Sequence, residues 1–327
     1  MSYARIIGTG LYVPEKVVTN LDLEKVMDTT DEWIRQRTGI VQRHVIAHEG
    51  VATSDLAVGA SRKALEAAHI RPEELDMIVV ATMTPDHLLP STACLVQAKL
   101  GATNAGAFDV MAACSGFIYA LSTAHNLVRT GQCKTVLVAG AEIFSNRLDF
   151  HDRNTAVLFG DGAGAIVVQA TDEEGGVLST HLHADGTQYD VLWVPAGGSA
   201  APPTHERIDS GGLFLRMKGP ELFKAAIRLF AEAVTEALEH NGCTIDQIDL
   251  FIPHQANARI IEMTAERLGL PMEKVLINID RYANTTAASI PIAIDEAVHD
   301  GKIKTNDLVL LAAFGGGLTW ASALIKW

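Results

Sequence analysis

Three side chains far apart in the sequence have types suited to acyl-transfer chemistry. Cys114 lies in the run AACSGF, directly before an apolar helix, so its thiol meets the free N–H groups of a helix N-terminus. That position favours a thiolate and predicts a lowered pKa for Cys114. His254 follows Pro253 at the end of an apolar run, and Asn284 lies in the small-residue segment YANTTAAS. Each also has a structural interpretation that stays open: a buried core cysteine, a satisfied histidine and a helix-capping asparagine.

The elements that must position these residues repeat within the chain. Residues 62–80 read as a helix, a turn and a buried strand, and residues 235–252 repeat that order. The segments that follow also correspond, so that Cys114 and Asn284 occupy equivalent helix starts. Helix starts related by a pseudo-twofold axis bring both side chains near that axis, with His254 at an adjoining strand end, where ligands usually bind. The repeat therefore predicts that the three side chains converge on one pocket.

The same repeat predicts the fold class. Apolar strands that alternate with helices indicate α/β structure with mixed, mostly parallel sheets, covered by helices on both faces. Two stacked copies give a five-layer αβαβα architecture, with an N-terminal half over residues 1–172 and a C-terminal half over residues 173–327. Strands are expected at 105–110 and, equivalently, at 273–279.

Two further segments lie outside the repeat. Residues 195–212 are rich in Gly, Pro and Ser and predict a long loop. Pro220 then begins an amphipathic helix that closes at Gly242.

Composition narrows the classes of function. The 327 residues carry a formal net charge of −13 and are 48% hydrophobic, which disfavours nucleic-acid binding and is typical of a soluble globular protein. The four cysteines form no C-x-x-C pair and no signal peptide is evident, so we expect reduced thiols in a cytoplasmic protein. The uncharged stretch 308–325 has a Gly315–Gly317 turn at its centre, so we expect two strands and no membrane helix.

Two short motifs carry no cofactor prediction. Gly160–Gly164 (GDGAG) precedes a strand, whereas a dinucleotide loop precedes a helix. His181-x-His183 lacks a third ligand at suitable spacing, so no metal site is expected.

Taken together, the motifs resemble β-ketoacyl-acyl carrier protein synthase III, of the thiolase superfamily. The resemblance spans essentially the whole chain and is carried by TDEWIR with RTGI near the N-terminus, AACSGF, FGDGAG, PHQAN, YANTTAAS and AFGGGLTW. A thiolase would bring a second catalytic cysteine and the long-chain condensing synthases a second histidine. Asn284 in this sequence selects the type III branch.

The resemblance implies decarboxylative condensation of a short acyl-CoA with malonyl-acyl carrier protein, which gives 3-oxoacyl-acyl carrier protein and initiates fatty acid biosynthesis. It implies an acyl-Cys114 intermediate, with His254 and Asn284 as hydrogen-bond donors to the enolate oxygen. The backbone N–H groups of Cys114 and Gly316 would hold the second oxyanion. CoA thioester is then a substrate, and no cofactor or metal is expected.

The resemblance also implies contacts away from the reacting atoms. The residues expected to bind CoA are Trp33, Arg37, Arg153, Met217, Phe223, Ala226, Ala256 and Asn257. Those expected to bind the carrier protein are Lys224, Gln255, Ala256, Asn257, Ala258, Arg259 and Arg267. Phe314 and Leu89 belong to the acyl pocket, with Leu89 supplied by the partner of a homodimer through the loop 86–90. Pro220 and Asn154 depart from the pattern of related sequences, which leaves their effect on CoA binding open.

Two other functions are compatible with parts of the sequence. A related enzyme of secondary metabolism would keep the acyl-Cys114 step and use another acceptor. A non-catalytic partner subunit with the same fold usually loses the nucleophile, so the joint presence of Cys114, His254 and Asn284 argues against it. The sequence leaves the length and branching of the acyl group open, although Leu89, where many relatives carry Phe, suggests a roomier pocket.

Overall fold

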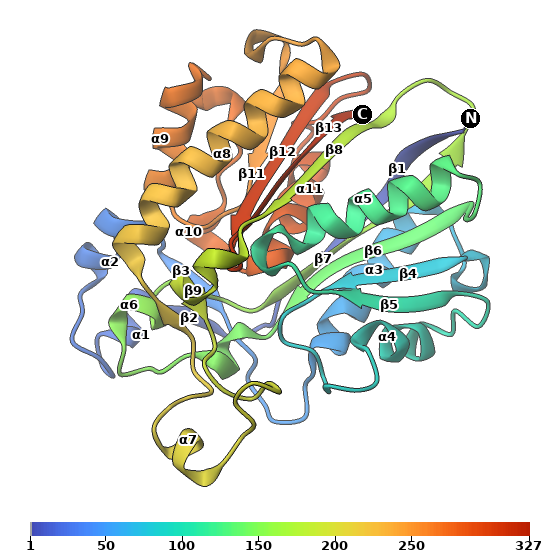
Figure 1. Cartoon of the computed structure of the whole chain (residues 1–327). Helices are drawn as coiled ribbons and strands as arrows, with labels where there is room; N and C mark the ends of the chain where they lie inside the picture. Colours follow the sequence, from blue (N-terminus) through green and yellow to red (C-terminus); the bar gives the residue numbers. More distant parts are fainter. Residues whose placement is uncertain (1) are drawn as a thin grey trace.

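The computed structural model describes residues 2–327, which form two main sheets with helices between and outside them (Figure 1). The first sheet has the strand order β1-β7-β6-β4-β5 and the second has the order β11-β12-β13-β8. The first sheet contains β1 (Tyr3–Tyr12), β4 (Met77–Ala81), β5 (Gly106–Val110), β6 (Thr135–Glu142) and β7 (Gly162–Thr171). The second contains β8 (Gly176–Ala184), β11 (Leu250–Pro253), β12 (Leu308–Gly315) and β13 (Thr319–Lys326).

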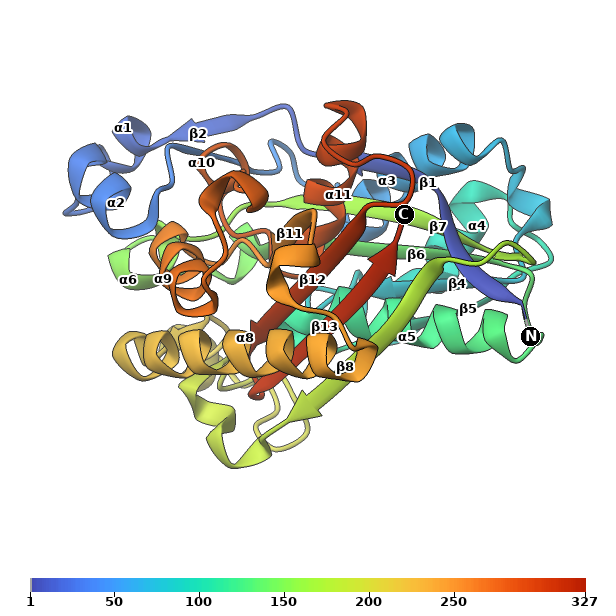
Figure 2. The ribbon, with the colours of Figure 1, turned by 90° about the horizontal axis from the view of Figure 1, so that it is seen from above.

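The helices complete the expected five layers. Helices α3 (Thr53–Ala68) and α4 (Thr92–Leu100) pack on the outer face of the first sheet, and α8 (Gly219–Asn241) and α9 (Ala258–Leu268) lie outside the second (Figure 2). Helices α5 (Gly116–Arg129) and α11 (Ser289–His299) lie between the sheets. On α5, Phe117 and Leu121 share one apolar core with Val138 of the first sheet and Leu311 of the second. This central layer fixes the start of α5 and, with it, Cys114.

The sheets are mixed, as predicted, but they are not mostly parallel. Within residues 2–327, β4 pairs in parallel with β5 and β6, and β11 with β12, whereas the four other pairs of the two main sheets are antiparallel. The antiparallel pair β12–β13, formed by the uncharged stretch 308–325, follows from its short connection. Strand β12 ends at Gly315 and β13 begins at Thr319, a connection too short for the crossover helix that parallel strands need.

The strand expected at 273–279 does not form. Met272–Lys274 is a 3-10 turn, Val275 makes an isolated bridge to Phe251, and α10 (Ile279–Tyr282) follows. The side chain of Gln255 takes the place of a neighbouring strand, because it donates to the Leu276 carbonyl and accepts from the Asn278 N–H.

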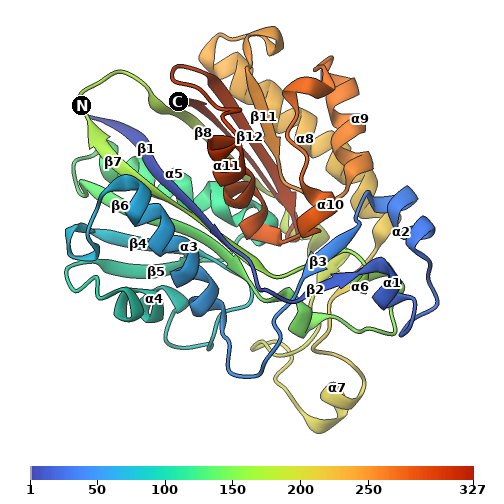
Figure 3. The ribbon, with the colours of Figure 1, turned by 180° about the vertical axis from the view of Figure 1, so that it is seen from behind.

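An N-terminal excursion packs beside the second half of the chain. It comprises β2 (Val17–Thr19), α1 (Asn20–Leu23), α2 (Asp31–Thr38) and β3 (Gln42–His44), which lie next to α6 (Arg153–Ala156) and α10 (Figure 3). Ile34 and Ile40 of this excursion share a small core with Val157 and Ile279.

The expected loop 195–212 projects from the body and carries the short helix α7 (His205–Asp209), between β9 (Leu192–Trp193) and β10 (Arg216–Met217). The chain crosses from the first sheet to the second between Thr171 and Gly176, where the proposed boundary between the halves falls. No helix within residues 2–327 is long and apolar enough to span a membrane.

Candidate active site

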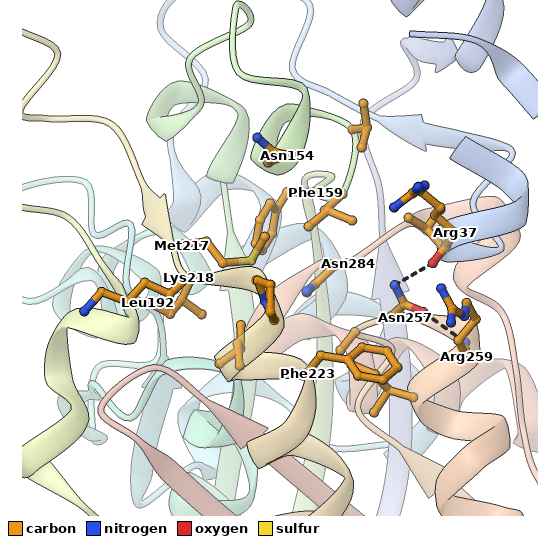
Figure 4. Close-up of a pocket in the computed structure, with 18 of the residues that line it drawn as sticks. Arg37, Asn154, Phe159, Leu192, Met217, Lys218, Phe223, Asn257, Arg259 and Asn284 are labelled. Carbon is orange, nitrogen blue, oxygen red and sulfur yellow. Dashed lines mark hydrogen bonds between the residues drawn. The ribbon is translucent and has the colours of Figure 1, made fainter. Parts of the chain in front are cut away.

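One cavity brings the three chemically distinctive side chains together. Its volume is about 680 Å³, and Cys114, His254 and Asn284 all line it. Figure 4 shows Asn284 among the residues around this space, which Phe159 and Met217 also line. Phe314 and Gly315, from the end of β12, complete the inner wall. The structure therefore places a thiol, an imidazole and a carboxamide at one pocket, as the repeat predicts.

The backbone around Cys114 is tightly constrained. Cys114 lies in the 3-10 turn Ala113–Ser115 that leads into α5, and Ala113 adopts a left-handed φ of 48°. The end of β12 presses on this turn: a Cβ added to Gly315 would lie 2.6 Å from the Cys114 nitrogen. Glycine at this position therefore lets the strand and the turn that carries Cys114 meet.

The protonation state of Cys114 differs from the sequence expectation. Burial raises the pKa of the thiol, and the negative charge of Glu142 raises it further, although the start of α5 is close by. The helix terminus alone favours a lowered pKa for Cys114, but burial in the closed cavity has the opposite and larger effect. The Cys114 side chain is therefore largely a neutral thiol at neutral pH.

Glu142 is a functional neighbour that sequence reasoning missed. It is the last residue of β6, is fully buried, and accepts hydrogen bonds from the Thr84 hydroxyl (2.6 Å) and the Met83 N–H (3.0 Å). Burial raises the pKa of its carboxyl to about 7, although the hydrogen bonds that it accepts favour the charged form and lower the pKa. The available signal was an acidic residue that ends the otherwise uncharged strand TVLVAGAE.

His254 is held as a neutral hydrogen-bond donor. It follows β11, is 1% exposed, and its Nδ1 lies 2.6 Å from the Ser289 hydroxyl at the start of α11. Burial lowers the pKa of the imidazole to about 3, so it is uncharged at neutral pH. A Ser289 hydroxyl that donates to Nδ1 leaves the ring proton on Nε2. Ser289, the last letter of YANTTAAS, was also missed by sequence reasoning.

Asn284 is fixed at both its backbone and its side chain. Its N–H donates to the Leu158 carbonyl (2.9 Å), and its own carbonyl accepts from Gly160 (3.1 Å). Its Oδ1 accepts from the Thr286 N–H at 2.8 Å. With the amide oxygen occupied in this way, the amide Nδ2 is the donor that remains for a ligand.

The cavity mouth carries most of the residues expected to bind CoA. The Arg37 and Arg153 guanidinium carbons lie 4.8 Å and 5.1 Å from the centroid of the Trp33 ring. Met217, Phe223, Ala256 and Asn257 also line the cavity, as do the atypical Pro220 and Asn154.

One expected CoA residue lies away from the cavity, and another has a structural role beside its place in the cavity wall. Ala226 does not reach the cavity, since it is fully buried in the core beneath α8. Asn257 caps α9 by accepting from the Arg259 N–H, and its amide donates to the Arg37 carbonyl at 3.0 Å (Figure 4).

The residues expected to bind the carrier protein divide into surface and interior groups. Lys224, Arg259 and Arg267 are exposed on α8 and α9, and the Arg259 guanidinium lies 5.6 Å from the Phe223 ring centroid, at the cavity mouth. Arg267 instead borders a separate hollow that contains Glu232 and Glu236. Ala258 packs against Gly39, where a Cβ would lie 2.6 Å from the Ala258 side chain.

Gln255 differs from its predicted position, while the predicted roles of Leu89 and Gly316 stay predictions. Gln255 is 1% exposed and bonded to the interior backbone, so it is no surface contact. Leu89 is 87% exposed in its loop and lies outside the cavity of its own chain. Gly316 follows Gly315 and packs against the Leu192 carbonyl, and its role stays a prediction.

The histidines of β8 are engaged with protein groups. His183 Nε2 lies 2.5 Å from a Glu236 carboxyl oxygen, and its ring stacks on Trp320. No group of three or more potential metal ligands is present within residues 2–327.

Comparisons with known proteins agree with this site. Two family models match: 3-oxoacyl-[acyl-carrier-protein] synthase III over residues 108–186, and the C-terminal part of the same family over residues 238–327. A β-ketoacyl-[acyl-carrier-protein] synthase III of Xanthomonas campestris pv. campestris is 55% identical over 325 residues, which cover 99% of this chain and 98% of that protein.

Solved structures confirm the predicted fold. The crystal structure of 3-oxoacyl-[acyl-carrier-protein] synthase III from Aquifex aeolicus VF5 superposes with a TM-score of 0.92 at 48% identity, covering 99% of this chain and 100% of that one. The priming β-ketosynthase of the R1128 polyketide pathway gives 0.92 at 37% identity, with 99% and 96% covered. The shared sequence over nearly the full length, together with the converging Cys, His and Asn, shows that this chain belongs to the β-ketoacyl-acyl carrier protein synthase III family of condensing acyltransferases.

Proposed function

We propose that this enzyme condenses a short acyl-CoA with malonyl-acyl carrier protein, with loss of CO2, and so starts fatty acid chains. The observation that carries the proposal is the single cavity that holds the Cys114 thiol beside two uncharged N–H donors, His254 and Asn284.

In the first half-reaction, Cys114 becomes acylated. Its sulfur attacks the thioester carbonyl of acyl-CoA, a new C–S bond forms, and the bond to the CoA sulfur breaks. The proton lost from Cys114 leaves with CoA as its free thiol. The backbone N–H groups of Cys114 and Gly316 stabilise the tetrahedral oxyanion.

In the second half-reaction, malonyl-acyl carrier protein occupies the same cavity. The bond between the carboxylate carbon and the α-carbon breaks, CO2 leaves, and the electron pair moves onto the thioester oxygen as an enolate. His254 Nε2–H and Asn284 Nδ2–H donate to that oxygen. Because burial lowers the pKa of the His254 imidazolium to about 3, the ring is uncharged, and the N–H of an uncharged imidazole is a very weak acid. It therefore donates a hydrogen bond to the enolate without protonating it, and the enolate remains nucleophilic. The enolate carbon then attacks the acyl-Cys114 carbonyl, and the bond between that carbonyl and the Cys114 sulfur breaks. The released thiolate takes up one proton from water and returns to the neutral thiol.

The cavity mouth and its rim bind the carriers. Trp33 and Arg153 hold the adenine of CoA, and Arg37 holds its phosphates, because stacked rings and guanidinium groups recognise bases and phosphates. Lys224 and Arg259 attract the acidic carrier protein to the mouth, while the net charge of −13 makes this attraction local and sensitive to salt.

A homodimer completes the acyl pocket. Strand β5 is the edge of its sheet, and four apolar side chains near it are exposed: Leu88, Leu89, Phe108 and Met111. An uncovered edge of this kind pairs with another strand, and β5 of a second copy joins the two sheets into one. Leu89 of each copy then reaches the acyl pocket of the other. We place the enzyme in the cytoplasm, where its four free cysteines stay reduced.

The test is acylation followed by condensation. Incubation with acetyl-CoA should add one acetyl group per chain, detected by intact-mass measurement, and Cys114→Ala should add none. A panel of acetyl-, butyryl- and branched acyl-CoA primers with malonyl-acyl carrier protein then identifies the primer.

The outcomes separate the competing functions. An acylated enzyme that condenses with another acceptor but not with malonyl-acyl carrier protein would favour a polyketide-type function, as in the R1128 relative named for that pathway. The absence of any adduct would favour a non-catalytic subunit.

A further inference from the structure

A second large cavity lies behind the catalytic one. Its volume is about 960 Å³, and it is lined by residues of the β2–β3 excursion, of the segment 45–51 and of the segment 145–159. Phe159 lines both cavities, so the second lies against the back wall of the catalytic pocket. This size falls in the range of small-molecule sites, and the proposed condensation makes no use of the space.

The walls of this cavity are mainly apolar. They include Val17, Val18, Leu23, Val26, Leu148 and Phe150. Val17, Val26 and Phe150 remain exposed although they are large apolar residues, so an apolar occupant would remove their surface from water.

A buried cation forms part of the inner wall. Arg43 is 2% exposed, and its guanidinium donates only to neutral acceptors: the carbonyls of Val18 and Val157 and the side chain of Asn20. Its Nε has no hydrogen-bond partner within residues 2–327. Burial lowers the pKa of Arg43 to about 10, and no described carboxylate counters that effect.

The other charges of the cavity leave Arg43 uncompensated. Lys16 is exposed at the rim and adds a second positive charge. Two carboxylates also line the cavity, Asp22 and Glu49. The Asp22 carboxylate is bonded to Lys25 and Thr19, Glu49 is exposed to solvent, and neither pairs with Arg43 in the described part of the chain. A buried charge without a counterion is costly, and an anionic group at Arg43 would relieve that cost.

We propose that this cavity binds an amphiphilic anion, in which a carboxylate or phosphate head reaches Arg43 and an apolar chain lies along the valine and phenylalanine walls. The shared chemistry is an oxyanion on an alkyl chain, and a free fatty acid and an alkyl phosphate are its two possible sources. The site is distinct from the CoA tunnel, although Phe159 places its occupant directly behind the acyl pocket.

Calorimetric titration of the dimeric enzyme, with CoA at saturation to fill the catalytic tunnel, tests the proposal. Dodecanoate and dodecyl phosphate are the probes, and dodecanol is the uncharged control. We expect saturable binding of at least one anion, about 10- to 100-fold tighter than that of dodecanol, because hydrogen bonds to a charged group carry the difference.

Val45 offers a matched pair of variants. It lies two residues after Arg43 on the same extended segment, so both face the cavity that they line. Val45→Glu supplies Arg43 with an internal carboxylate and should abolish binding of the anion, whereas Val45→Gln has the same shape without charge and should retain it. Lys16→Glu, at the exposed rim, should weaken binding several-fold and provides a second test if Val45→Glu fails to fold. The proposal is overturned if neither anion binds, if CoA displaces the anion, or if Val45→Glu or Lys16→Glu binds it as the parent does.

Discussion

Replacement of Glu142 by Gln isolates the effect of the buried charge on Cys114. The substitution keeps the size of the side chain and its acceptor for the Met83 N–H, and removes the ionisable group. In the folded enzyme the pKa of Glu142 is raised from 4.5 to about 7, which corresponds to about 3 kcal/mol at 1.4 kcal/mol per unit.

The unfolding free energy depends on pH because the folded chain binds the proton of the Glu142 carboxyl more tightly than the unfolded chain does. Below pH 4.5, Glu142 is protonated in both the folded and the unfolded chain, and no penalty arises. As the pH rises from 4.5 to about 7, the unfolded chain ionises first, so the free energy of unfolding falls. Above pH 7 the loss is complete.

Urea denaturation at pH 5 and pH 8, at one protein concentration, measures this difference. The decrease in unfolding free energy between the two pH values should be about 2.5 kcal/mol smaller in Glu142→Gln than in the parent, because part of the loss has already occurred at pH 5. Glu239→Gln, at an exposed position of α8, is the control and should behave as the parent. Because Glu142 raises the pKa of Cys114, the variant should also react faster with iodoacetamide at pH 8. Identical pH profiles of stability and alkylation in parent and variant would refute the reasoning.

Three further substitutions test the roles of individual residues. Arg259→Glu should raise the KM for malonyl-acyl carrier protein and leave acylation by acetyl-CoA intact, and an equal loss of both would contradict the basic patch. Ser289→Ala removes the hydrogen-bond partner of His254 Nδ1. Loss of a hydrogen bond that contributes about 1 kcal/mol should slow condensation about fivefold and leave acylation unchanged. An unchanged condensation rate would show that this hydrogen bond does not orient the imidazole. Trp33→Ala should raise the KM for acetyl-CoA about tenfold without changing alkylation of Cys114 by iodoacetamide, and an unaltered KM would remove Trp33 from the CoA site.

The sequence was sufficient to predict the site's three distinctive side chains because their positions follow from the repeat. Corresponding helix starts bring Cys114 and Asn284 to one pocket, and the end of an apolar strand brings His254 there too. The two positions are not the equivalent ones that the repeat had suggested: Cys114 lies within the turn Ala113–Ser115 before α5, whereas Asn284 lies two residues before the matching turn Thr286–Ala288. The layered fold followed from the same periodicity. The proportion of parallel strand pairs could not be predicted in this way, because the direction of each strand depends on whether its connection crosses over the sheet or only turns back beside it.

The environment of the site required the structure. Glu142 meets Thr84 and Met83 only because β4 and β6 are neighbours in the sheet, which the sequence does not specify. The raised pKa of Cys114 likewise depends on closure of the cavity and on that carboxylate. Gln255 belonged to a motif that indicated a surface contact, yet its side chain points inward to replace a missing strand.

The central claim is that Cys114 alone takes up the acyl group, whereas His254 and Asn284 act in the condensation step. One paired measurement tests this claim most directly. Intact-mass measurement after incubation with acetyl-CoA, followed by addition of malonyl-acyl carrier protein, separates acylation from condensation in His254→Ala and Asn284→Ala. Both variants should still acquire one acetyl group on Cys114, while condensation falls by about 10²–10³ because each loses a donor to the enolate oxygen. Variants that remain unacetylated, or that condense at the parental rate, would contradict the account.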